Sequence, residues 1–116
     1  MDAKRREVGS LVRWLRKHFP TAHPIRVHWY ASDSAFENKG ATAETVTMME
    51  TVRKQPHSHL VRVRESRSTE AIMQAMIDEW AHALREQLPI PVDEENPHDA
   101  IWGAIYAAIW SKWTAD

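Results

Sequence analysis

The chain has 116 residues, which suits a single domain over residues 1–116 and leaves little room for a second hydrophobic core. Hydrophobic residues make up 43% of it and charged residues 27%, a composition that excludes general disorder. The formal net charge of -1 argues against a protein that coats nucleic acid or an anionic membrane through its overall charge. Because cysteine is absent, disulfide frameworks and thiolate zinc sites are excluded, and a metal ion would need His and carboxylate ligands.

The first twenty residues are basic and alternate Arg and Lys with apolar residues. They lack the continuous apolar run of a signal peptide or a membrane span. Together with the absence of cysteine, this favours a cytoplasmic location and predicts no membrane partner.

The N-terminal half predicts one helix followed by three strands. Residues 3–18 have apolar residues at helical spacing, residues 25–30 and 61–64 alternate apolar and polar residues, and residues 42–52 are rich in Thr and Val. The apolar positions of the predicted helix are Val8, Leu11, Val12, Leu15 and Phe19.

Two more helices are predicted in the C-terminal half. The first runs over residues 69–88, with Ser66 or Ser68 as its N-cap, and ends before Pro89. The last helix is predicted to begin with Asn96 as N-cap and Pro97 in its first position, and to run to Trp113. This order predicts an α+β fold in which a small three-stranded antiparallel sheet is covered by helices.

The helix over residues 69–88 places Asp78 and His82 one turn apart, on the side opposite its apolar residues. Two ligands at this spacing converge on one ion, and Glu79, about 100° around the helix, can contact a metal-bound water. The alternative is an ordinary charged helix face, where such a pair contributes only about 0.2–0.5 kcal/mol. The apolar residues are Met73, Met76, Ile77, Trp80, Leu84 and Leu88.

His98 is predicted at the second position of the last helix, on the side that carries Ile101, Ile105 and Ile109. It is therefore expected to point into the domain. The amino end of a helix disfavours imidazolium, and neutral imidazole is the form that binds metal. The alternative is a buried histidine that assists a helix cap.

These residues carry a family resemblance. The segment from Leu60 to Trp110 resembles the C-terminal part of SprT-like zinc metallopeptidase domains, especially short phage-encoded ones, and the order of the preceding elements also fits. Those domains have a helix with His-Glu-Trp-Ala-His-Ala and then His-Gly-x-x-(Phe/Trp) at the start of a final helix. The matching residues here are Asp78-Glu79-Trp80-Ala81-His82-Ala83 and His98-Asp99-Ala100-Ile101-Trp102.

The resemblance implies a zincin-like fold, a zinc ion held by His82 and His98, Glu79 as the general base, and hydrolysis of peptide bonds in a protein or peptide substrate. Asp78 stands where the family has its first histidine ligand. Aspartate also binds zinc, so Asp78 is the expected third ligand. The replacement leaves three outcomes open: a metal site with altered reactivity, a preference for another metal, or a lost site.

Two other groups of residues are candidates for binding. His57-Ser58-His59 has a spacing at which a strand presents two imidazoles on one face, but the preceding Pro56 favours a loop leading into an edge strand. The N-terminal helix concentrates basic residues that suit phosphate contacts, and some SprT-like proteases act on proteins attached to DNA. The alternative is a solvated charged face. The basic residues are Lys4, Arg5, Arg6, Arg13, Arg16 and Lys17.

Three functional hypotheses therefore remain: a metal-dependent peptidase, a catalytically inactive relative whose scaffold binds protein or DNA, and an interaction protein that oligomerises through its last helix. The third hypothesis arises because aromatic residues cover much of the last helix. The C-terminal third also holds four of the six tryptophans, so the core is expected to be densest there. The aromatic residues of the last helix are Trp102, Tyr106, Trp110 and Trp113.

Overall fold

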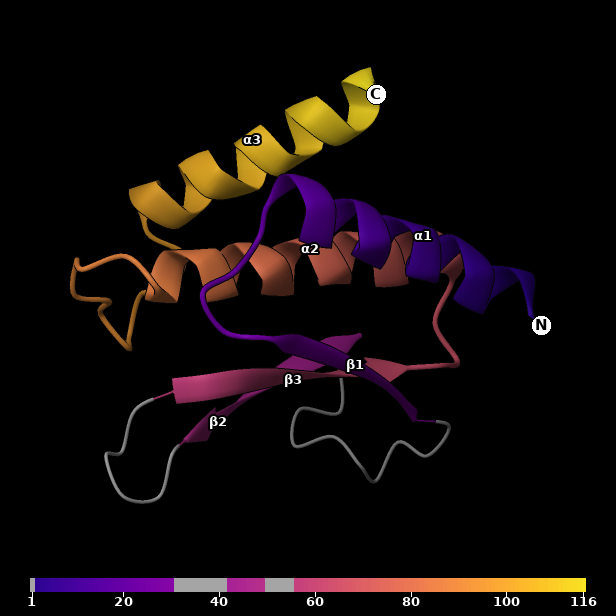
Figure 1. Cartoon of the computed structure of the whole chain (residues 1–116), viewed down its shortest axis with the longest axis horizontal. Coiled ribbons are helices and arrows are strands. Elements are labelled where there is room, and N and C mark those ends of the chain that lie inside the picture. Colours follow the sequence, from indigo (N-terminus) through magenta and orange to yellow (C-terminus); the bar gives the residue numbers. More distant parts are fainter. Residues whose placement is uncertain (1, 31–41, 50–55) are drawn as a thin grey trace.

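The computed structural model describes residues 2–30, 42–49 and 56–116, with only the backbone of residues 44–49 and 56–57. Its elements follow the predicted order of one helix, three strands and two helices. The fold is α+β, with three layers: the sheet, then the first two helices side by side, then the last helix (Figure 1). The elements are α1 (Ala3–His18), β1 (Ile25–Tyr30), β2 (Ala43–Met49), β3 (Pro56–Arg64), α2 (Thr69–Glu86) and α3 (Ala100–Ala115).

Helix α1 confirms the predicted helix over residues 3–18. The Asp2 carboxylate caps it by accepting a hydrogen bond from the Lys4 backbone N–H at 2.8 Å. Three basic residues in its last turn face the negative end of the helix dipole. Four of the five predicted apolar positions are buried, Val8, Leu11, Val12 and Leu15, and Phe19 is half-buried against the same core.

The sheet differs from the predicted three antiparallel strands. Its order is β1-β3-β2, and β1 pairs with β3 in parallel, with Ile25 opposite His59 and Tyr30 opposite Arg64. Only β2 and β3 are antiparallel, with Ala43 opposite Val63. The alternation of apolar residues fixes which side chains face the helices, but a strand reversed in direction has the same alternation, so the direction was not determined.

Strand β3 is also longer and more central than predicted. It begins at Pro56 and lies between the other two strands, so it is not an edge strand. A proline at the first position of a strand removes only one terminal hydrogen bond, which a central strand tolerates. From this strand, His59, Val61 and Val63 are buried.

Helix α2 confirms Ser68 as N-cap, with its hydroxyl accepting a hydrogen bond from the Ala71 N–H, and it ends two residues earlier than predicted. Helix α2 lies between the sheet and α3, so it is covered on two sides. Its buried residues therefore extend beyond a single apolar stripe. Met73, Leu84 and Leu88 are only half-buried. The buried residues of α2 are Ile72, Met76, Ile77, Trp80, Ala81, Ala83 and Arg85.

The predicted start of the last helix is wrong by three residues. Helix α3 begins at Ala100, and its N-cap is Asp99, whose carboxylate accepts a 2.8 Å hydrogen bond from the Trp102 N–H. Asn96 and Pro97 lie in the preceding loop. Asp99 takes the cap because its carboxylate also pairs with Arg85, which Asn96 does not do.

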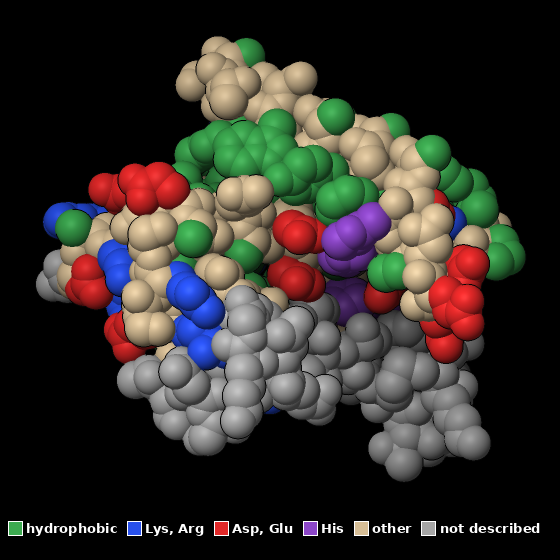
Figure 2. Space-filling model, turned by 180° about the vertical axis from the view of Figure 1, so that it is seen from behind, with side chains coloured by type: hydrophobic (Ala, Val, Ile, Leu, Met, Phe, Trp, Pro, Cys, Tyr) green, Lys and Arg blue, Asp and Glu red, His purple; other side chains and the backbone are tan. Residues whose placement is uncertain are grey.

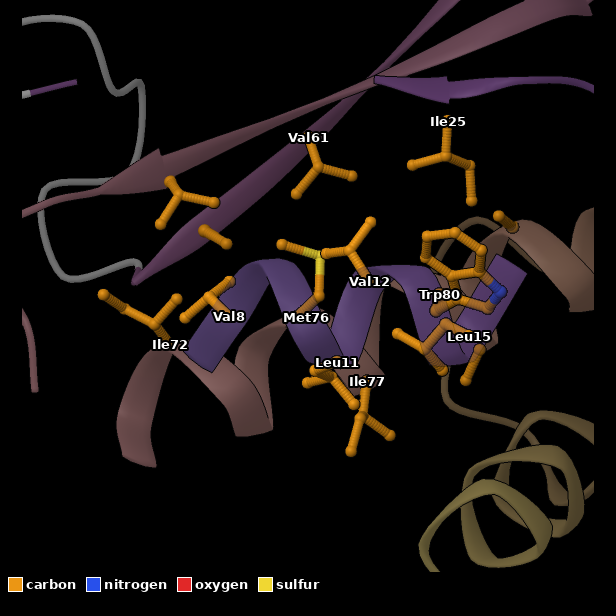
Figure 3. Close-up of a cluster of buried hydrophobic side chains, with 14 of the residues drawn as sticks. Val8, Leu11, Val12, Leu15, Ile25, Val61, Ile72, Met76, Ile77 and Trp80 are labelled. Carbon is orange, nitrogen blue, oxygen red and sulfur yellow. The ribbon is translucent and has the colours of Figure 1, made fainter. Parts of the chain in front are cut away.

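The core lies between the sheet and the α1–α2 layer. In Figure 3, Ile25 and Val61 point from the strands toward Val12, Met76 and Trp80 of the helices. The predicted concentration of the core in the C-terminal third is wrong. Only Trp80 among those four tryptophans is fully buried, and the three on α3 pack half-buried at the edge of the core. None of the helices in the described ranges is long and apolar enough to cross a membrane.

Candidate metal centre

Helix α2 presents Asp78 and His82 one turn apart, as the spacing predicts. The apolar contacts of Met76, Ile77 and Trp80 fix the rotation of the helix, and the two polar residues then lie away from the sheet core. His82 Nε2 is 3.2 Å from Asp78 Oδ1, and their side chains are 22% and 37% exposed. Both residues are accessible from outside while remaining partly shielded from water.

His98 completes the group from the residue before the N-cap of α3. Its Nε2 lies 2.8 Å from His82 Nε2 and 3.7 Å from Asp78 Oδ1. The three residues each offer one ligand atom within 4.8 Å of the others. The prediction that His98 points inward is wrong: its side chain is 54% exposed, and because it precedes α3, the helical spacing to Ile101 and Ile105 does not apply to it.

Aromatic rings support both imidazoles. Trp102, in the first turn of α3, stacks on His98 with ring centroids 4.1 Å apart and lies 5.3 Å from His82 at an interplanar angle of 28°. Tyr106 continues the stack on Trp102 at 4.9 Å. Figure 2 shows histidine and acidic side chains next to a band of hydrophobic side chains on this side of the molecule. An exposed side chain such as His98 would otherwise rotate freely. Stacking on Trp102 limits the rotation of the His98 ring.

The group fits a divalent ion. Ligand atoms around one tetrahedral zinc, with bonds near 2 Å, lie about 3 to 4 Å apart. Two of the three distances, 3.2 and 3.7 Å, fall in this range, and the 2.8 Å contact between the imidazoles has to widen slightly. Asp78 Oδ1 is inaccessible to solvent, and the two imidazole Nε2 atoms face it at 3.2 and 3.7 Å, so a proton or a metal ion on these rings is what offsets the burial of its negative charge.

The environment of His82 combines opposing effects on its pKa. Burial lowers the pKa of His82, but the hydrogen bond to Asp78 and the negative charges of Glu79, Asp78 and Glu86 outweigh burial and raise it above its ordinary value. The site is therefore electronegative. Such a site attracts a cation, either a proton on His82 or a metal ion.

Glu79 lies beside the group but is not one of its three members. Asp78 and Glu79 both line a cavity of about 390 Å³ between α2 and the start of β2. Ala71 and Ala75 of α2 also line this cavity, and their small side chains leave it open. The remaining wall residues are Thr42, Ala43 and Gln74.

His59, from the alternative His57-Ser58-His59 segment, does not join the group. It is buried on the helix-facing side of β3, where burial lowers its pKa despite the charge of Glu86, and its ring lies 6.1 Å from that of His23. The side chain of His57 lies outside the described residues. The sequence favours a loop leading into an edge strand for this segment, and that prediction is wrong, because the segment lies in the central strand β3.

Several basic residues predicted for DNA contact already have partners within the chain. The Lys4 ammonium donates hydrogen bonds to the backbone oxygens of Glu65 and Arg67. Arg5 pairs with Glu65 at 2.7 Å and lies over the Trp29 ring.

The rest of the basic set lies along the same helix. Arg13 donates to the hydroxyl of Ser10, and Arg16 donates to the Ile25 carbonyl oxygen. Arg6 and Lys17 are exposed.

The sequence interpretation missed two residues of the site, Arg85 and Trp102. Arg85 is buried and pairs with Asp99, and Trp102 carries the ring on which both imidazoles stack. The sequence contains a signal for the Arg85–Asp99 ion pair. Asp99 directly follows the candidate ligand His98, and Arg85 lies one helical turn after the candidate ligand His82.

Comparisons with protein-family models, with curated proteins and with solved structures give no match. The resemblance to SprT-like domains therefore rests on the motif residues alone. The possible metal group Asp78, His82 and His98 rests on the structure and does not depend on that resemblance.

Proposed function

We propose that the protein is a metal-dependent hydrolase of the SprT-like kind that binds one divalent ion, zinc in the first instance, through Asp78, His82 and His98 and cleaves peptide bonds. The observation that supports this most is the convergence of these three side chains within 4.8 Å of one another. Helix α2 supplies Asp78 and His82, and the loop directly before the N-cap of α3 supplies His98.

Each side chain has a role in this proposal. The bound ion supplies a polarised carbonyl and a more acidic water. Glu79, on the helix turn that holds Asp78 and beside the same cavity, accepts the proton of the attacking water and returns it to the leaving amine. Asp78 balances the charge of the cation, while Trp102 holds the imidazole planes by stacking.

The aspartate ligand has a chemical consequence. An anionic oxygen ligand reduces the effective charge of the ion relative to a third neutral imidazole, so the bound water is less acidic. Carboxylate and imidazole together suit zinc and also other first-row divalent ions. We therefore expect hydrolysis with a pH optimum above that of a site with three histidines.

Metal analysis tests the proposal directly. We expect untagged protein to carry near-stoichiometric zinc, and the His82→Ala variant to lose it. The Asp78→His variant, which restores the family's ligand, serves as the matched control. Zinc in Asp78→His but not in the native protein would show that the native site has lost metal binding.

The second candidate function is an inactive SprT-like scaffold that binds protein or DNA. One observation favours it: the two imidazoles already pair with each other through the 2.8 Å contact between their Nε2 atoms, so these two ring nitrogens need no ion as a partner. DNA contact would use the exposed Arg6, Arg13 and Lys17 of α1. This function would be favoured if metal-free protein binds labelled duplex DNA and the binding weakens when all three residues are replaced by glutamine.

A further inference from the structure

Arg85 is a buried charge with several hydrogen-bond partners. Its side chain is 2% exposed, and its guanidinium contacts both carboxylate oxygens of Asp99, with the shortest distance 2.8 Å. Its Nη1 and Nη2 atoms also donate to the carbonyl oxygens of Ile90 and Pro91, each at 2.9 Å. One side chain on α2 thus binds both ends of the loop that leads to α3.

This arrangement fixes the residue next to Asp99. His98 is exposed, and the only described contacts of its ring are with Asp78, His82 and Trp102. Asp99 sets the backbone position of His98. The Arg85 guanidinium holds Asp99 against α2, and Arg85 itself lies one turn after His82 on that helix. Asp99 also caps α3 through the Trp102 N–H and so positions the stacking ring as well.

We propose that Arg85 and Asp99 are positioning residues that place His98, and with it the third ligand atom, against His82. Arg85 is not one of the three residues of the candidate metal group, and it acts on that group through the loop and Asp99. The part of the proposal that concerns metal affinity rests on the proposed function. The placement of His98 itself does not, and it is measurable in the metal-free protein.

The first experiment uses NMR of histidine ring protons in metal-free protein. We expect Arg85→Met to shift the His98 ring resonances toward those of a solvent-exposed histidine and to remove the nuclear Overhauser contact between the His82 and His98 rings. Asp99→Asn is the milder variant, since asparagine is an equally good N-cap and only the ion pair is weakened. If Arg85→Met does not fold, Asp99→Asn decides the question.

The second experiment is a double-mutant cycle on zinc affinity. Arg85→Met is expected to weaken zinc binding about 10- to 100-fold, the range seen when groups that orient a ligand are lost. In a His98→Ala background the same substitution should have no further effect, because the ligand it positions is absent. Arg85→Lys should recover part of the affinity, since lysine reaches Asp99 but cannot also bind both carbonyls.

Arg5→Met is the matched control. Arg5 also pairs with a carboxylate at 2.7 Å, but on the exposed side of α1, and its loss should change neither the His98 resonances nor zinc affinity. Unchanged His98 resonances in both Arg85→Met and Asp99→Asn, with a folded core, would overturn the proposal. Equal losses of zinc affinity on Arg85→Met in the native and the His98→Ala backgrounds would also overturn the proposal. Native protein that binds no zinc would contradict the proposed function, and the NMR result would still stand.

Discussion

His82 and His98 face each other through their Nε2 atoms at 2.8 Å, although 16 positions separate them in the chain. A hydrogen bond between two imidazoles requires a proton on one of these nitrogens. Binding of one metal ion by both nitrogens requires that neither is protonated. Binding of a metal ion to both rings would therefore release the proton that lies between them.

The pH dependence of stability in metal-free protein follows from the raised pKa of His82. A group whose folded pKa lies above its ordinary value of 6.5 stabilises the fold fully below that pH, and this stabilisation is lost as the pH rises through the raised pKa. We expect Asp78→Asn to reduce this effect, because it removes the carboxylate that accepts the hydrogen bond.

Urea unfolding with a chelator present, compared between about pH 5 and about pH 8, measures the difference. His59 acts in the opposite direction because burial lowers its pKa, so the comparison of the two proteins isolates His82. Parallel pH profiles for native protein and Asp78→Asn would contradict the prediction.

Under the proposed function, Glu79→Gln should separate metal binding from catalysis. Glutamine keeps the size of the side chain but cannot accept a proton, so peptide hydrolysis should fall about 10²- to 10⁴-fold, while bound zinc remains stoichiometric. Cleavage of an unstructured protein substrate, followed together with metal content, is the measurement. Loss of zinc in Glu79→Gln would instead make this residue a ligand.

Trp80 should be the most sensitive of the C-terminal tryptophans. It is fully buried, and its indole N–H donates to the Phe19 carbonyl oxygen at 2.8 Å. We expect Trp80→Ala to lower the free energy of unfolding by about 3–5 kcal/mol. Trp110→Ala, at a half-buried position, should cost about 1 kcal/mol. Urea unfolding measures the free energy of unfolding of both variants. Equal decreases in Trp80→Ala and Trp110→Ala would contradict the central place of Trp80 in the core.

Acid sensitivity should depend on Asp99. The hydrogen bond from Arg85 and the backbone N–H of Trp102 lower the pKa of Asp99 below its ordinary value of 3.8. Its stabilisation is therefore present above that pH and is lost as the pH falls through the lowered pKa. Asp99→Asn should flatten the acid end of the stability profile. Circular dichroism during an acid titration tests this, and an unchanged acid midpoint in Asp99→Asn would contradict it.

The sequence was most informative where one local rule acted alone. The spacing of Val8, Leu11 and Leu15 set the buried face of α1, and the one-turn separation of Asp78 and His82 brought two ligand atoms together. Both results depend on helix geometry over a few residues and need no knowledge of distant segments.

The rest depended on pairings between segments far apart in the chain. The partner of β1 is β3, and alternation of apolar residues gives no direction for that pairing. Asn96 was the predicted cap of α3, but Asp99, which pairs with Arg85 14 residues earlier, is the actual cap, and this distant pairing is not visible in the local sequence. An arginine on a helix is expected in water, so the burial of Arg85 was not foreseen.

The ligand group joins two points that are close in the sequence, whereas the pairing of Ile25 with His59 closes a much longer segment. Closing a short loop removes little chain entropy, so the α2–α3 hairpin should assemble early and independently of the sheet. An ion held by His82 and His98 would then act as a reversible cross-link across that hairpin. The resistance of the protein to unfolding would rise with the free metal concentration, by mass action.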